Sequence, residues 1–109
     1  MIQIEIQDQR VSISGHAWYA PPGYDIVCAG ISVLADTLVM SLNEITEDII
    51  TVDDEHGLME IEYESLSEAG MLLVDSFVIG AEAIADEYPY NVQVRDDRSR
   101  RETITTVKL

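Results

Sequence analysis

Strict alternation of apolar and polar residues at the start of the chain is the strongest constraint on its fold. Ile2, Ile4 and Ile6 alternate with Gln and Glu, and the alternation resumes from Val11 to Ser14. A period of two is that of a strand with one buried face. The first sixteen residues therefore predict a β-hairpin that other elements must cover.

Two long apolar segments supply the predicted helices. Asp25 occupies an N-cap position, and apolar residues then recur at three- and four-residue steps from Ile26 to about Leu42. This helix is apolar over a wide arc, so we expect it to be buried on more than one side. Ser67 opens a second helix over residues 67–87, which Pro89 ends. Its predicted inward face consists of Leu72, Leu73, Ser76, Ile79, Gly80, Ala83, Ile84 and Tyr88.

Short β-prone segments complete the chain. Ile49–Val52 and Leu58–Tyr63 flank a polar turn, and Asn91–Val94 reads as the last core strand. The order ββ-α-ββ-α-β predicts the α+β class, with a mostly antiparallel sheet packed against two long helices. A chain of 109 residues has room for one small domain with one core, which excludes a two-domain enzyme.

The charge of the chain is strongly negative and unevenly distributed. There are 21 Asp and Glu residues against 6 Lys and Arg, a net charge of -15. Arg10 is the one basic residue before Arg95, whereas the last fifteen residues carry a small net positive charge. An acidic body repels nucleic acid and anionic membranes, and it attracts basic partners. We therefore expect no nucleic acid or membrane as a partner.

Cysteine content and the N-terminal pattern bear on the compartment. The single cysteine, Cys28, excludes an internal disulfide and hence a small secreted disulfide scaffold. The N-terminal segment has no charged region followed by an apolar one, as a secretion signal would have. We also expect no stretch that approaches the roughly 18 apolar residues of a spanning helix. These patterns favour a cytoplasmic protein with a reduced thiol.

Cys28 and His16 are the residues most capable of chemistry. Cys28 lies at the third position of the predicted helix, where unpaired amides and the helix dipole favour a thiolate. His16 precedes it by twelve residues, a loop length that can return the imidazole to the thiol as its base. Both residues also have ordinary interpretations, since free cysteines are usually buried apolar groups and a histidine at a strand end is usually solvated.

Asp25 and Ser32 share the helix side of the thiol. They lie three residues before and four residues after Cys28. Asp25 either orients His16 as a third catalytic group or serves only as the helix cap. Ser32 either bonds the thiolate or a substrate, or it bonds back to the carbonyl of Cys28.

The loop between His16 and Cys28 is rich in aromatic residues and contains Pro21-Pro22-Gly23. Trp18, Tyr19 and Tyr24 are typical of a substrate-gripping flap, or of a loop that packs on itself.

His56 is the other histidine, and it lies in a polar turn with no second His or Cys nearby. Consecutive turn residues rarely converge on one ion, and no Gly-rich phosphate loop is present, so we expect no metal and no cofactor.

Two motifs together resemble a known family. Gly15-His16-Ala17, followed by Asp25-Ile26-Val27-Cys28-Ala29-Gly30-Ile31-Ser32-Val33-Leu34, is similar to the ribosomal-processing cysteine protease (Prp) family. The segment from Leu72 to Gly80 and Tyr88-Pro89 also resembles that family's C-terminal helix. The likeness spans residues 1–95, and the basic tail over residues 96–109 is an addition that a typical member lacks.

The resemblance implies an activity and roles. Members are compact α+β homodimers that remove a short N-terminal extension from large-subunit ribosomal protein number twenty-seven, after a pair of Phe residues. Carried over, Cys28 is the nucleophile and His16 the base, with Gly15, Asp25 and Ser32 in supporting positions. We expect the amides of Cys28 and Ala29 to form the oxyanion hole. A phage capsid or scaffold precursor as substrate, and a non-catalytic acidic module that binds basic ribosomal proteins, are the alternatives.

Overall fold

The computed structural model describes residues 1–21, 23–55 and 57–99. Its elements confirm the predicted order and the α+β class. They are β1 (Ile2–Gln7), β2 (Arg10–Ser14), α1 (Ile26–Ile45), β3 (Thr51–Glu55), β4 (Leu58–Glu62), α2 (Glu68–Glu87) and β5 (Val92–Asp96). Pro22, His56 and residues 100–109, which include the β-prone segment 103–107, lie outside the described residues.

The strands form one five-stranded sheet in the order β3-β4-β2-β1-β5. All neighbouring pairs are antiparallel except β1 and β5, which are parallel, so the mostly antiparallel sheet is confirmed. The register aligns the apolar positions, because Ile6 lies opposite Val11 and Val11 lies opposite Ile61. One face of the sheet is therefore apolar from β4 across to β1.

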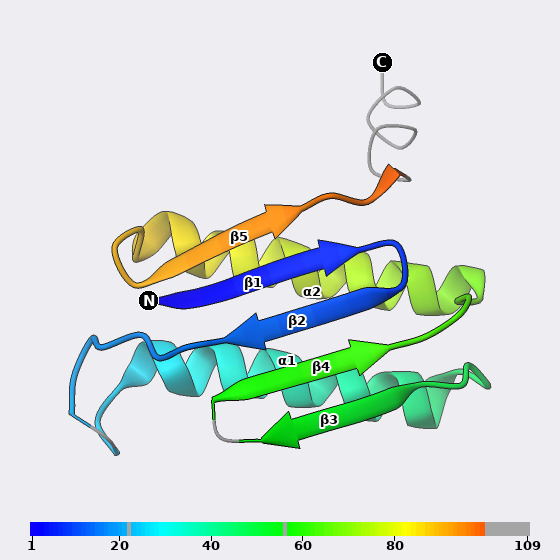
Figure 1. Cartoon of the computed structure of the whole chain (residues 1–109), viewed down its shortest axis with the longest axis horizontal. Helices are drawn as coiled ribbons and strands as arrows, with labels where there is room; N and C mark the ends of the chain where they lie inside the picture. The colour runs from blue at the N-terminus through cyan, green and yellow to red at the C-terminus, as the bar shows by residue number, and fades with distance from the viewer. Residues whose placement is uncertain (22, 56, 100–109) are drawn as a thin grey trace.

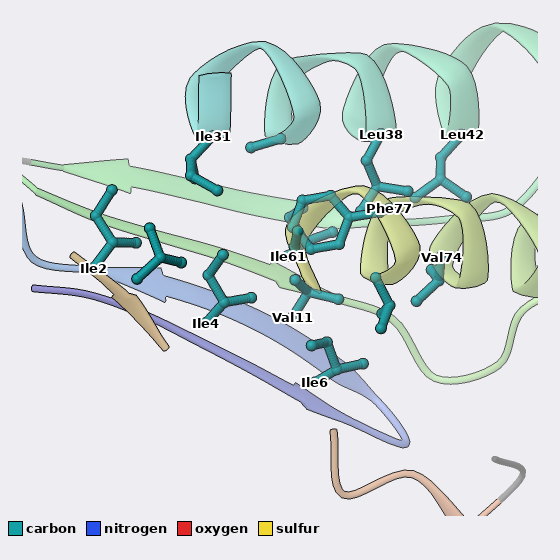
Figure 2. Close-up of a cluster of buried hydrophobic side chains, with 14 of the residues drawn as sticks. Ile2, Ile4, Ile6, Val11, Ile31, Leu38, Leu42, Ile61, Val74 and Phe77 are labelled. Atoms are coloured by element: carbon teal, nitrogen blue, oxygen red, sulfur yellow. The ribbon is translucent and has the colours of Figure 1, made fainter. Parts of the chain in front are cut away.

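Both helices pack on that apolar face, α1 behind β2 and β4, and α2 behind β1 and β5 (Figure 1). Side chains from the strands point toward the helices and interlock with Ile31, Leu38 and Phe77 (Figure 2). The other face carries the polar members of the alternation, with Glu5 opposite Ser12 and Ser12 opposite Glu60. The period-two pattern thus gives the molecule two layers, the sheet and the pair of helices that covers its apolar face.

Helix α1 buries one face, so the expectation of burial on more than one side is wrong. Its buried residues are Val27, Ile31, Ala35, Leu38 and Leu42. Ile26, Val33 and Met40, spaced by seven residues, are 59%, 64% and 57% exposed. The outer side of α1 is consequently an apolar stripe that the described chain leaves uncovered.

Helix α2 presents a different face from the predicted one. Val74, Phe77 and Val78 are buried, whereas Leu72 and Ile79 are 58% and 66% exposed. The helix has two apolar arcs, and the arc with the aromatic ring fills the space over β1 and β5. Of the predicted inward residues, Leu73, Ile84 and Tyr88 are partly buried at the edge of the core.

Strand β3 lies further along the chain than predicted. It covers Thr51–Glu55 rather than residues 49–52, because β4 pairs with it as far as Glu55 opposite Leu58. Every residue of β3 is exposed, and Ile49 is 86% exposed. At this edge of the sheet, pairing rather than burial fixes the strand, and the acidic edge opposes association with other strands.

Helix α1 is also, contrary to expectation, long and apolar enough by length and composition to span a membrane. The same test is passed by core helices of water-soluble proteins. A signal sequence near the N-terminus passes it as well, and in this structure the buried face of α1 packs against the sheet.

The residues that follow β5 are bonded to the body of the domain. Arg98 is only 8% exposed and donates to Asp75 of α2 at 2.7 Å and to Asp96 of β5 at 2.8 Å. Ser99 donates through its hydroxyl to Asp8 in the β1–β2 turn at 2.9 Å. The predicted boundary at residue 95 stays a prediction, but residues 96–99 pack on the residues before it.

Burial disfavours the charge on Arg98, but its hydrogen bonds to Asp96 and Asp75 outweigh this effect and raise the pKa of the guanidinium. The arginine therefore stays charged, and its pairing ties β5 to α2.

We predict that Arg98→Ala lowers the free energy of unfolding by about 2–3 kcal/mol, because it removes the cation between two largely buried carboxylates. Arg95 is the matched control, since it also pairs with two carboxylates but its side chain is 64% exposed. Arg95→Ala is expected to cost at most about 0.5 kcal/mol. Urea unfolding of both variants measures the difference, and equal losses would contradict the importance given to the buried pair.

Candidate active site

The candidate site lies at the end of the sheet where β2 stops and the loop to α1 begins (Figure 1). The amide of Gly15 donates to the carbonyl of Gly57 at 2.9 Å, which joins this turn to the start of β4. Gly15 has a φ of +88°, and a Cβ placed there would collide with the carbonyl oxygen of Met1. Only glycine permits this close approach of the turn to the start of β1.

Asp25 caps α1 as predicted and also holds the preceding loop. One carboxylate oxygen accepts from the amides of Val27 and Cys28, each at 3.0 Å, and the other accepts from Tyr19 at 3.1 Å. The bond from the Cys28 amide is the main cause that lowers the pKa of Asp25, with help from Tyr19 and Ala20, although loss of water opposes it. Asp25 is thus ionised at neutral pH and fixes where α1 begins.

The thiol of Cys28 is half-buried and has a backbone neighbour from the loop. The amide of Ala17 donates to the sulfur at 3.4 Å. Ala17 is 2% exposed, and its carbonyl accepts from the side-chain amide of Asn91 at 2.8 Å. The residue next to His16 is therefore held on both sides.

Two hollows meet at His16, Cys28 and Ser32. The first, of about 400 Å³, is lined by His16, Trp18, Ala20, Gly23, Asp25, Cys28, Ala29 and Ser32. The second, of about 330 Å³, is lined by Ile13, Gly15, His16, Cys28, Ile31, Ser32, Ala35, Asp36, Asp54, Gly57, Leu58 and Met59. The fold therefore brings the predicted nucleophile and base to one surface, where both of them line two hollows.

His16 is exposed and leans on its own loop. Its ring centre lies 5.2 Å from that of Trp18, at a tilt of 53°. A Cβ at Gly57 would come within 3.3 Å of its Nε2, so the start of β4 also borders the imidazole. Trp18 has a φ of +56°, a left-handed conformation that is unfavourable for a bulky residue.

The three aromatic residues of the loop separate in the structure. Trp18 lines the first hollow, whereas Tyr19 packs edge-on against Tyr88 at the end of α2, with ring centres 5.2 Å apart. Tyr24 is 79% exposed, and neither tyrosine lines the two hollows as the described residues form them. Their predicted role in gripping substrate stays a prediction, and Trp18 is the one placed beside the thiol.

The oxyanion hole expected from the sequence is wrong in its donors. The Cys28 amide bonds the Asp25 carboxylate, and the Ala29 amide bonds the Asp25 carbonyl at 3.1 Å. Both amides therefore already donate hydrogen bonds within the first turn of α1. Asp25 accepts hydrogen bonds from the amides of Tyr19, Val27 and Cys28, which is the geometry of a cap, and the Cys28 side chain also bonds its carboxylate.

The sequence did not predict the roles of Ala17, whose amide bonds the thiol, and of Asn91, whose side chain bonds the carbonyl of Ala17. Asn91 lies 74 residues beyond Ala17, and no spacing in the sequence connects them. Among residues 1–21, 23–55 and 57–99, no group of three His, Cys, Asp or Glu residues is arranged to hold a metal ion.

Comparison with known proteins places the chain. The profile of the cysteine protease Prp family matches residues 1–93. A ribosomal processing protease Prp from S. aureus, solved with a covalently linked product peptide, is similar at 24% identity and a TM-score of 0.83. That similarity covers 89% of this chain and all of the other.

Two further structures are similar. A protein from Streptococcus mutans is 28% identical with a TM-score of 0.76, over 91% of this chain and 96% of the other. The S. aureus protease with a substrate peptide is 22% identical with a TM-score of 0.79, over 89% of this chain and all of the other. No curated protein sequence matched. With its Cys28 and His16 inside the matched residues, the chain belongs to the cysteine protease Prp family.

Proposed function

We propose that this protein removes the N-terminal extension of large-subunit ribosomal protein number twenty-seven, with Cys28 as nucleophile and His16 as base. The observation that carries the proposal is the meeting of His16 and Cys28 at the junction of two hollows. The S. aureus protease is described as a ribosomal processing enzyme and holds a covalently linked product peptide. Cys28 is the only cysteine in this chain that could make such a bond.

The reaction follows from the nucleophile and its neighbour. His16 takes the thiol proton, and the sulfur of Cys28 forms a bond to the scissile carbonyl carbon while the C=O electron pair moves to oxygen. When that pair returns, the C–N bond breaks and His16 gives its proton to the leaving amine. Water, deprotonated by His16, then attacks the thioester, and the C–S bond breaks to regenerate the thiol.

In this proposal, the substrate residues before the scissile bond occupy one hollow and those after it occupy the other. Trp18, Ala20, Gly23 and Ala29 give the first hollow an apolar wall that suits the aromatic side chains before the cut. The second hollow, which shares His16, Cys28 and Ser32 with the first, contains Asp36 and Asp54 among apolar residues. The enzyme acts in the cytoplasm, where a lone thiol stays reduced.

The acidic body supplies long-range attraction for a basic substrate protein. Apart from the hollows beside the thiol, an open cleft of about 730 Å³ lies between the segment that joins α1 to β3 and the segment that follows β4. It contains Glu47, Asp48, Glu62 and Glu64. Together with the net charge of -15, such carboxylates raise the encounter rate with a positively charged ribosomal protein.

We also propose that two copies of the chain pair through the outer sides of the helices. Ile26, Val33 and Met40 of α1 and Leu72 and Ile79 of α2 are each more than half exposed. Apolar area of this kind gains free energy when a second copy covers it.

We predict that Cys28→Ala lowers kcat for a peptide with the Phe-Phe site by at least about a thousandfold, because no other thiol is present. His16→Ala is expected to act in the same direction, and His56→Ala is its matched control. Peptide cleavage followed by mass spectrometry measures the products. Unchanged turnover in Cys28→Ala contradicts the nucleophile, while cleavage of a phage precursor but not the ribosomal extension contradicts the substrate. Binding of the ribosomal protein without any cleavage by the wild type favours the non-catalytic module.

We predict that cleavage of the whole ribosomal protein slows about tenfold as salt rises from low to high concentration, because screening shortens the reach of the acidic field. A short uncharged peptide with the same site serves as the control and is expected to change little. Initial rates for both substrates across a salt series provide the measurement. A parallel loss for both would show that steering is not the cause.

We predict that Val33→Asp shifts the protein from dimer to monomer, because a charge in the centre of the stripe on α1 opposes its burial. Ile49→Asp, at an even more exposed apolar position outside both helices, leaves the dimer intact. Sedimentation velocity distinguishes the two states. A monomeric wild type at high concentration refutes the pairing.

A further inference from the structure

Asn91 links the last strand of the sheet to the candidate active site. Its side-chain amide donates to the carbonyl of Ala17 at 2.8 Å, in a partly buried position. Its own backbone is fixed on both sides, because its amide donates to Tyr88 at 3.0 Å and its carbonyl accepts from Ile2 at 2.8 Å. The backbone that carries this carboxamide is therefore held in place where α2, β5 and β1 meet.

Ala17 connects Asn91 to the thiol through two hydrogen bonds. Its carbonyl is held by Asn91, and its amide donates to the sulfur of Cys28 at 3.4 Å. Ala17 is buried and its own side chain is a single methyl group. Besides the packing of this methyl group in the core, the two hydrogen bonds fix the orientation of the Ala17 backbone.

The backbone that follows Ala17 is strained and needs such an anchor. Trp18 adopts a φ of +56°, a left-handed conformation that is unfavourable for a bulky residue. Such a conformation persists only where surrounding contacts over-determine it. Asn91 on one side of Trp18, and Asp25 bonding the Tyr19 amide on the other, provide those contacts.

The amide of Ala17 also has no competitor in the first turn of α1 as a donor to the sulfur. The amides of Val27, Cys28 and Ala29 all bond to Asp25. Among the described residues, the Ala17 amide is the backbone group that donates a hydrogen bond to the sulfur. When the sulfur attacks a carbonyl, the negative charge moves to an oxygen beside it, so the same amide lies close to the new charge.

We propose that Asn91 is a positioning residue for catalysis: by holding the Ala17 carbonyl, it aims the Ala17 amide at the Cys28 sulfur, where that amide stabilises the thiolate and then the oxyanion. The proposal rests on Cys28 being the nucleophile, as proposed above. It assigns a catalytic contribution to the residue that directly precedes β5, 63 positions beyond the nucleophile in the sequence.

The test compares the wild type with Asn91→Ala and Asn91→Asp. The aspartate has nearly the shape of asparagine but, when ionised, has no N–H to donate. Both variants are expected to lower kcat for the Phe-Phe peptide about tenfold, the effect of one hydrogen bond to a charged group, with KM little changed. Asn91→Asp behaving like Asn91→Ala identifies the lost donor, rather than lost volume, as the cause.

A second readout separates positioning from mere support of the fold. The rate of Cys28 alkylation by iodoacetamide is measured against pH, and both variants are expected to need a pH about one unit higher for half-maximal reaction. The titratable groups bordering the thiol are His16 and Asp25, with Asp36 and Asp54 farther along the second hollow. The Asn91→Ala variant leaves all four unchanged.

Gln9→Ala is the matched control. Gln9 also uses a side-chain amide to hold a distant carbonyl, that of Glu64 at 2.9 Å, but it does so at the opposite end of β1. This variant is expected to keep the kcat and the alkylation profile of the wild type, even if its melting temperature falls.

Two results would overturn the proposal. One is an alkylation profile and a kcat, corrected for folded fraction, that stay at wild-type values in Asn91→Ala. The other is a change of equal size in Gln9→Ala, which would show a general effect of stability. If Cys28→Ala keeps full activity, the nucleophile itself is wrong, and that result is distinct from either of these.

Discussion

The one-sided sheet is the constraint on which the rest of the structure depends. Because Ile2, Ile4 and Ile6 all face the same way, the sheet has a single surface that must be removed from water. Both long helices are therefore drawn to that surface, and the chain has to cross it twice. The first crossing starts at the end of β2, which places the loop, the start of α1 and the starts of β1, β4 and β5 at one end of the sheet. The candidate site forms where these segments meet.

The sequence predicted the order and class of the elements because each of them has a clear local pattern. It failed where two local patterns competed. Helix α2 has one apolar arc through Leu72 and Ile79 and another through Val74 and Phe77, and periodicity alone does not choose between them. The choice is made by the shape of the space over β1 and β5, which is a property of the whole fold.

The candidate site shows the same division. Cys28, His16 and Asp25 were found because they lie near one another in the chain and share a local motif. The donors around the thiol were assigned wrongly, since the capping carboxylate of Asp25 consumes the first-turn amides. Asn91 was missed because only the parallel pairing of β1 with β5 brings it to Ala17. Long-range pairing leaves no signature in spacing, so residues that depend on it are visible only in three dimensions.

The parallel pairing of β1 with β5 has a consequence for folding during synthesis. Synthesis proceeds from the N-terminus, so the strand that carries Ile2 leaves the ribosome long before the strand that carries Val92. Until then β1 has an open edge, and the turn at Gly15 lacks the neighbours that Tyr88 and Asn91 supply. A nascent chain therefore exposes its cysteine without the surroundings of the finished site. The contacts around Cys28 are complete only when β5 has been synthesised and has paired with β1.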